Sequence, residues 1–171
     1  MTGDKLKIDL ETIRHSAAHL MAQAVKQLYP ETQVTIGPVI EDGFYYDFYR
    51  ESPFVPEDLE KIEQRMKEIS LKSLDIVRQE LPRKKALEMF DEMDEPFKLE
   101  VIKDIESNDP ISVYCQGEFT DLCRGPHVNN TNEIKSFKLL NTSAAYWRGD
   151  ERNKVLQRIY GTAWNTDKEL R

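Results

Sequence analysis

The sequence has few cysteines and glycines and no long apolar run. With 2 cysteines and 7 glycines among 171 residues, it is neither a small fold held by several disulfides nor a glycine-rich fibrous chain. No apolar run reaches the roughly 18 residues that span a bilayer, and the polar first five residues do not resemble a secretory leader. We therefore expect a cytoplasmic protein without membrane contact, whose Cys115 and Cys123 are free thiols.

Acidic residues outnumber basic ones, with 31 Asp and Glu against 24 Lys and Arg. The net charge of -7 argues against a protein that holds a nucleic-acid duplex alone, because such binding relies on lysine and arginine. Residues 131–171 are an exception, with 8 Lys and Arg against 5 Asp and Glu. This part of the chain could contact a short single-stranded RNA tail.

Hydrophobic spacing predicts a mixture of helices and strands. Helices are expected over residues 9–28, 56–72, 82–93 and, from an ambiguous pattern, 97–105. Strands are expected over 34–40, 44–49, 74–81, 111–115, 119–123, 136–140 and 155–164. The order lacks a βαβ rhythm, which predicts an α+β fold with a curved antiparallel sheet packed around the first helix. Residues 56–105 could form a small lobe of helices and strands within the domain.

All 3 histidines fall in two short motifs, HSAAH at 15–19 and CRGPH at 123–127. Residues four apart share one face of a helix, so His15 and His19 should present their imidazoles to one place. Gly125-Pro126 rules out a regular helix, and a wrapped loop would be needed to bring Cys123 and His127 together. Three imidazoles and a thiolate suit tetrahedral zinc; a pair of histidines on a solvated helix face is the ordinary alternative.

Two familiar hydrolase arrangements fit these motifs poorly. Ser16 occupies the place of the general-base glutamate in the H-E-x-x-H motif of metalloproteases. A cysteine hydrolase would need His127 as the base for Cys123, which depends on contact within the loop.

Several stretches resemble a known family. IRHSAAHL (13–20), IGPVI (36–40), GFYYD (43–47), DLCRGPH (121–127), AYWRGD (145–150) and LQRIYGTAW (156–164) are similar to the editing domain of bacterial-type threonyl-tRNA synthetases. The alanyl enzyme has a related domain. The resemblance runs from about Thr12 and implies an editing domain over 1–164, with 165–171 as the start of a linker helix.

The resemblance implies an aminoacyl-tRNA deacylase that removes serine from mischarged threonine tRNA, at the ester to the 3′-terminal adenosine. A missing methyl in a synthetic pocket discriminates by only about 1 to 3 kcal/mol, so a second, hydrolytic site is needed. The implied partners are the 3′ end of threonine tRNA and, if the chain is a fragment, the catalytic and anticodon domains of the synthetase. A free-standing editing factor is the other possibility, and no aminoacylation site is expected in this chain.

Site roles follow from the same resemblance. The implied catalytic residues are His15, His19, Lys98, Asp121, Cys123 and His127, and Gly37, Tyr46 and Arg124 would bind substrate. His15 and Lys98 should position and activate water, while Asp121 receives the seryl ammonium. No cofactor is expected to be required, because Lys98 would oppose a dication. If zinc binds, its ligands would be His15, His19, Cys123 and His127, as in the alanyl domain.

Two other functions stay open. One is a zinc-stabilised RNA-binding module without catalysis, which chelation would unfold. The other is an alanyl-type editing domain, which the GFYYD and RIYGTAW stretches disfavour.

Overall fold

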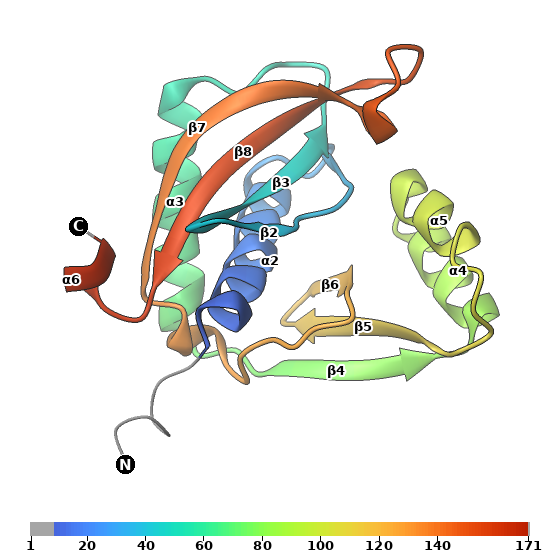
Figure 1. Cartoon of the computed structure of the whole chain (residues 1–171), viewed down its shortest axis with the longest axis horizontal. Helices are drawn as coiled ribbons and strands as arrows, with labels where there is room; N and C mark the ends of the chain where they lie inside the picture. Colours follow the sequence, from blue (N-terminus) through green and yellow to red (C-terminus); the bar gives the residue numbers. More distant parts are fainter. Residues whose placement is uncertain (1–8, 171) are drawn as a thin grey trace.

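The computed structural model describes residues 9–170, which form two antiparallel sheets around a central helix (Figure 1). The larger sheet contains β1 (Gln33–Val34), β2 (Val39–Ile40), β3 (Gly43–Tyr49), β7 (Ser136–Tyr146) and β8 (Val155–Trp164). Its order is β1-β3-β8-β7, with β2 also paired to β3. The smaller sheet has the order β4-β5-β6, formed by β4 (Ile76–Leu81), β5 (Ile111–Gln116) and β6 (Phe119–Leu122).

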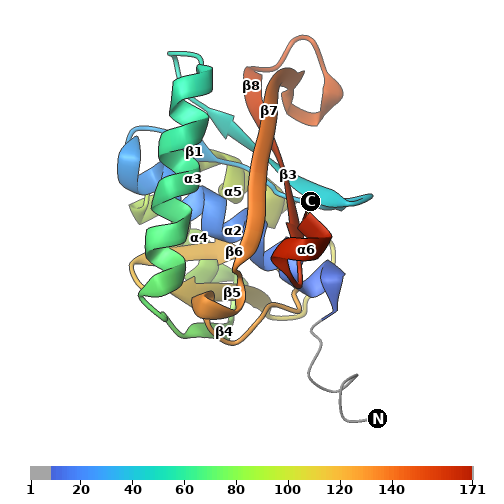
Figure 2. The same cartoon turned by 90° about the vertical axis from the view of Figure 1, so that its left-hand side faces the viewer.

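The helices are α2 (Leu10–Leu28), α3 (Pro56–Leu71), α4 (Arg83–Glu92), α5 (Pro96–Lys103) and the short α6 (Asp167–Leu170), with two 3₁₀ turns, η1 (Thr131–Glu133) and η2 (Trp147–Gly149). Figure 2 shows α3 running alongside β7, and both α3 and the larger sheet pack on α2. The predicted α+β class with an antiparallel sheet is confirmed. No helix within residues 9–170 is long and apolar enough to cross a membrane.

Helix α2 carries both histidines of the HSAAH motif and is buried around most of its circumference. Its small residues Ala17, Ala18 and Ala22 have no exposed surface, and short side chains let neighbouring elements approach the helix closely. His19 is consequently only 4% exposed. The middle of α2 therefore has no solvated face.

Two predicted strands differ from the observed ones. The stretch 34–40 is divided into β1 and β2, with residues 35–38 between them. Strand β7 continues to Tyr146, well beyond the predicted end at Leu140, and has an irregular register between Leu139 and Asn141. The extension pairs with β8 throughout. Cross-strand hydrogen bonding therefore keeps this segment extended, although its sequence lacks the alternation of apolar and polar residues that predicts a strand.

The apolar core consists of separate clusters. The largest joins α2 and α3 to the inner face of the larger sheet. A second lies between α4, α5 and β5 and contains Phe90, Ile102 and Val113. Phe97, Trp147 and Leu156 form a third, which fixes α5 against the start of β8. The residues implicated by the sequence lie where α2, β3, α5 and β6 meet.

Candidate functional site

The CRGPH loop is fixed directly on helix α2. The Ser16 hydroxyl donates to the carbonyl oxygen of Thr12 at 2.8 Å and accepts from the backbone N–H of Val128 at 2.9 Å. The ring of Tyr114 on β5 stacks on His127, with centroids 4.1 Å apart. Ser16, which sequence reasoning treated only as the replacement for a glutamate, thus joins the helix to the loop.

This attachment brings three ligand-type side chains together. The Nε2 atom of His127 lies 3.2 Å from Sγ of Cys123. The rings of His15 and His127 are 6.1 Å apart, and ligand atoms of His15, Cys123 and His127 all lie within 4.8 Å of one another. We call these three residues the His–Cys–His cluster.

His19 lies beside the cluster and faces a different partner. Its ring is 4.3 Å from that of His127, but its Nε2 atom is 3.4 Å from Oδ2 of Asp121. The four-residue zinc set expected from the sequence is therefore reduced to three residues among those that the structure describes. The helical spacing did not predict this, because the carboxylate arrives from β6.

A buried polar network lies next to His19. The ammonium of Lys98 pairs with Oδ1 of Asp121, donates to the carbonyl oxygen of Thr35, and lies 3.1 Å from the hydroxyl of Tyr46. That hydroxyl donates to Oδ2 of Asp121 at 2.7 Å. Lys98, Asp121 and Tyr46 are at most 1% exposed. The sequence alone suggests a surface lysine and a turn aspartate, whereas the structure buries both.

The hydrogen-bonding capacity of this network is used internally. An ammonium has three N–H donors, and those of Lys98 meet three oxygen atoms. Asp121 accepts from Lys98, Tyr46 and the N–H of Leu122, and it also faces His19. In this arrangement Asp121 has no surface on which to receive a substrate ammonium, and Lys98 has no free donor for water.

Burial keeps the histidines neutral. Desolvation lowers the pKa of His15 below its ordinary value, partly offset by Glu11. It lowers the pKa of His19 strongly, assisted by the charge of Lys98. The pKa of His127 falls to about 2 for the same reason, with further contributions from the other two histidines. All three rings are therefore uncharged near neutral pH, and each has a nitrogen lone pair that can accept a hydrogen bond or bind a metal.

The other two polar groups stay protonated. Burial, followed by the neighbouring Asp121 carboxylate, raises the pKa of Tyr46 well above its ordinary value. Burial also raises the pKa of the Cys123 thiol, against an opposing hydrogen bond from the Gly125 N–H. Without a metal, Cys123 is accordingly a thiol and a weak nucleophile.

The His–Cys–His cluster has the composition of an open zinc site, which uses three protein ligands and one further position. The Nδ1 atoms of His19 and His127 are buried and have no hydrogen-bond partner within residues 9–170. The hydrogen-bonding capacity of these two atoms is therefore unused by the described residues. The donor set is compatible with zinc and equally with a water-filled site.

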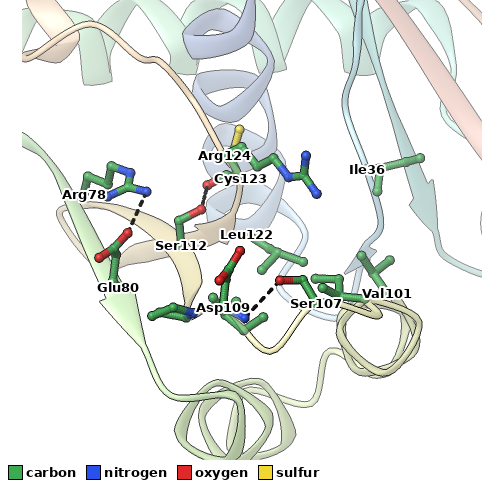
Figure 3. Close-up of a pocket in the computed structure, with 13 residues that line it drawn as sticks. Ile36, Arg78, Glu80, Val101, Ser107, Asp109, Ser112, Leu122, Cys123 and Arg124 are labelled. Atoms are coloured by element: carbon green, nitrogen blue, oxygen red, sulfur yellow. Dashed lines mark hydrogen bonds and ion pairs between the residues drawn. The ribbon is translucent and has the colours of Figure 1, made fainter.

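A cavity of about 800 Å³ opens beside the cluster (Figure 3). Cys123 and Arg124 line one side, and Ile36 and Val101 line the other. Arg124 is exposed and forms no ion pair with any described residue, and Figure 3 shows its guanidinium directed into this space. Cys123 is the one member of the cluster on the cavity wall, so it links the two.

Gly37 lies against the back of the site and does not line this cavity. A Cβ atom at Gly37 would overlap the ring of Tyr46 and lie 3.0 Å from the Tyr45 carbonyl oxygen. A glycine is therefore required at position 37, because any side chain would prevent the close approach of the 35–38 segment to β3. This packing holds Thr35 and Tyr46, two of the Lys98 partners, in register.

Sequence reasoning missed Glu95. It directly precedes α5 and is 1% exposed. Its carboxylate accepts from the backbone N–H of Val34 at 3.0 Å and pairs with Lys26 at 2.8 Å. Glu95 thus ties the start of α5, and with it Lys98, to β1 and α2. A glutamate just before a helix-starting proline was the available signal.

Comparison with known proteins identifies related sequences. Residues 111–160 match the Threonyl and Alanyl tRNA synthetase second additional domain. The chain is 58% identical over 166 residues to the threonine–tRNA ligase of Nitrosomonas europaea, covering 97% of the chain and 26% of that protein. It is 57% identical over 161 residues to that of Methylococcus capsulatus (94% and 25%) and 56% identical over 167 residues to that of Legionella pneumophila (98% and 26%). The chain thus spans about a quarter of the length of these relatives.

Proposed function

This chain contains a second additional domain of the threonyl- and alanyl-tRNA synthetase type and is homologous to threonine–tRNA ligases over nearly all of its length, and from this we propose that it hydrolyses misacylated tRNA. The substrate is serine esterified to threonine tRNA, and the bond cleaved is the ester to the terminal ribose. The main support is that His19 joins the His–Cys–His cluster to the Lys98–Asp121 pair, with its ring 4.3 Å from that of His127 and its Nε2 atom 3.4 Å from Asp121, beside a cavity of about 800 Å³.

His15 is the general base in this proposal. It is half-buried, belongs to the cluster, and has a lowered pKa that leaves it neutral. A neutral imidazole removes a proton from water as the water oxygen forms a bond to the ester carbonyl carbon. When the bond from that carbon to the ribose oxygen breaks, the proton passes to the ribose oxygen, giving free serine and a tRNA 3′ end.

Lys98 acts in this scheme through its neighbours. Its three donors are occupied, so it holds Tyr46 and Asp121, and Asp121 in turn orients His19. His19 and His127 have buried Nδ1 atoms that can bond to the substrate or to the attacking water. Lys98 and Asp121 are thus positioning residues, and the role first expected for Asp121 passes to groups with free bonding capacity.

Substrate binding falls to the cavity wall. Arg124 is a cation without an ion-pair partner among the described residues, which suits the phosphate of the terminal nucleotide. Gly37 and Tyr46 set the position of the 35–38 segment behind that nucleotide. We propose that the reaction requires no cofactor. If zinc binds, His15, Cys123 and His127 hold it, and it would lower the pKa of a bound water.

The test is hydrolysis of three esters by this chain: seryl and threonyl threonine tRNA, and seryl alanine tRNA. We expect hydrolysis of the first alone, and loss of at least about 100-fold in rate for His15→Ala, the range of general-base catalysis. Preference for seryl alanine tRNA would favour the alanyl-type alternative. No hydrolysis of any ester, together with unfolding on chelation, would favour the zinc-stabilised binding module.

The tRNA and the remaining parts of a synthetase are the proposed partners. They follow from the relatives, which are named threonine–tRNA ligases and are about four times as long as this chain. The acidic net charge of -7 suggests weak binding of tRNA by this chain alone. A complete ligase would then deliver the 3′ end to the cavity.

A further inference from the structure

A second hollow adjoins the cavity beside Cys123. Its volume is about 360 Å³, within the range of small-molecule sites. The two spaces share Ile36 and Val101 on their walls. The two spaces are therefore neighbours, close enough for consecutive nucleotides of one strand to occupy both. We call the second space the outer hollow; besides Ile36 and Val101 its wall contains Tyr45, Asp47, Asp104, Tyr146, Trp147, Arg148, Gly149 and Arg158.

The outer hollow combines exposed aromatic surface with arginine. Tyr146 is 46% exposed, so part of its ring is available for contact. Arg158 lies over the ring of Tyr45, 3.9 Å from its centroid, and is held there by two bonds to Asp47 of 2.8 and 3.0 Å. Aromatic rings next to arginine planes are the surfaces on which unpaired bases stack. These features favour single-stranded nucleic acid as the occupant.

Arg148 supplies a cation that a phosphate can reach. It forms an ion pair with Asp104, and both side chains are largely exposed, at 41% and 58%. Exposed pairs of this kind are weak, so a phosphate oxygen can replace the carboxylate. The backbone φ of Arg148 is 59°, a region uncommon for residues other than glycine.

The turn that presents Arg148 is held rigidly. Trp147 is buried, and its indole N–H donates to Glu100 on α5 at 3.2 Å. Its carbonyl oxygen accepts from the Asn153 side chain at 2.8 Å. A rigid surface loses little entropy when it binds a flexible strand. The hollow thus exists before any partner arrives.

We propose that the outer hollow binds the unpaired nucleotides that precede the terminal nucleotide of the RNA substrate. A base stacks on Tyr146, and the phosphate next to it pairs with Arg148. Arg124 lines the first space and Arg148 lines the outer hollow, and Ile36 and Val101 line both, so a strand that occupies the two spaces meets one cation in each. This inference rests on the proposed deacylase function and extends it from the ester to the RNA tail.

The experiment compares two substrates that differ only in the upstream RNA: seryl threonine tRNA and 3′-seryl adenosine. Tyr146→Ala should raise KM for the tRNA by about 5- to 150-fold, the range for loss of one stacked base. Arg148→Gln should raise KM for the tRNA and reduce the salt slope of binding by about 0.7. Neither change should alter hydrolysis of 3′-seryl adenosine, which has no nucleotide to place in the outer hollow.

Two matched variants control for general effects. Tyr146→Phe keeps the ring and should behave as the unchanged protein. Arg152→Gln removes the same charge from the same connection between β7 and β8. Arg152 does not line the hollow and pairs with Asp150 at 2.7 Å. This variant should leave KM unchanged.

The outcomes separate the two proposals. If the unchanged protein hydrolyses neither substrate, the deacylase function is wrong. If it hydrolyses the tRNA and the Tyr146 and Arg148 variants keep its KM, the outer hollow does not bind RNA. A fall in kcat for both substrates would also overturn the inference, because it would place these residues in the chemistry and not in RNA binding.

Discussion

The Lys98–Asp121 pair allows a quantitative test of how the site is built. Both side chains are at most 1% exposed, so replacing Lys98 with Met leaves a carboxylate buried without its cation. Loss of one partner of a buried pair costs about 3 to 5 kcal/mol. For a chain of 171 residues that corresponds to a fall in Tm of roughly 6 to 20 °C. Since domains are stable by about 5 to 15 kcal/mol, the variant should fold but be fragile.

The double variant Lys98→Met, Asp121→Asn isolates the pair. It removes both charges and keeps an acceptor for the Tyr46 hydroxyl, so its free energy of unfolding should exceed the additive expectation by at least about 2 kcal/mol. Urea denaturation of the four proteins, followed by far-ultraviolet circular dichroism, gives this coupling. Additive effects within about 0.5 kcal/mol would refute the reasoning, because independent sites behave in that way.

Three further predictions follow from the site. The kcat/KM for the seryl ester should decline as the pH falls below 6.5 and stay level above it, because the base is neutral His15, whose pKa lies below that value; a rate that increases towards acid would contradict this role. With a chelator present, the free energy of unfolding should be greatest above pH 6.5 and should decrease as the pH falls below that value. Each of His19 and His127 should contribute a decrease of roughly 1 kcal/mol per pH unit, because these rings take up protons in the unfolded chain but not when buried in the fold. Gly37→Ala should cost about 1 to 3 kcal/mol in urea denaturation and slow hydrolysis, because its Cβ displaces the Tyr46 ring; full activity would show that the Tyr46 position is unimportant.

The helices and most strands could be predicted because their signals are local. Pro56 begins α3 and the spacing of Ile62, Met66 and Ile69 marks its buried face, as the sequence predicted. The extension of β7 could not be predicted. Residues 141–145 are Asn, Thr, Ser, Ala and Ala, without alternation, and they become a strand because β8 supplies the pairing.

The site shows the same division between local and distant information. His15 and His19 could be singled out from their spacing and from the scarcity of histidine. Ser16 and Glu95 could not, because their partners Val128 and Val34 lie 112 and 61 residues away. A contact across such a distance leaves no periodic trace in one sequence. Lys98 and Asp121 were identified only through resemblance to a family.

A buried ion pair is a costly way to stabilise a core, since apolar side chains of similar volume are often as stable or more so. Here the Lys98–Asp121 pair has Tyr46 as a partner of both charges and His19 as a neighbour of the carboxylate. Its position fixes the donor and acceptor directions of two groups beside the His–Cys–His cluster. Fixed dipoles in a buried site stabilise developing charge without reorganising during the reaction. We infer that the pair is retained for this preorganisation, so that Lys98→Met, Asp121→Asn, although more stable than the two single changes predict together, should hydrolyse the seryl ester at least about 100-fold more slowly.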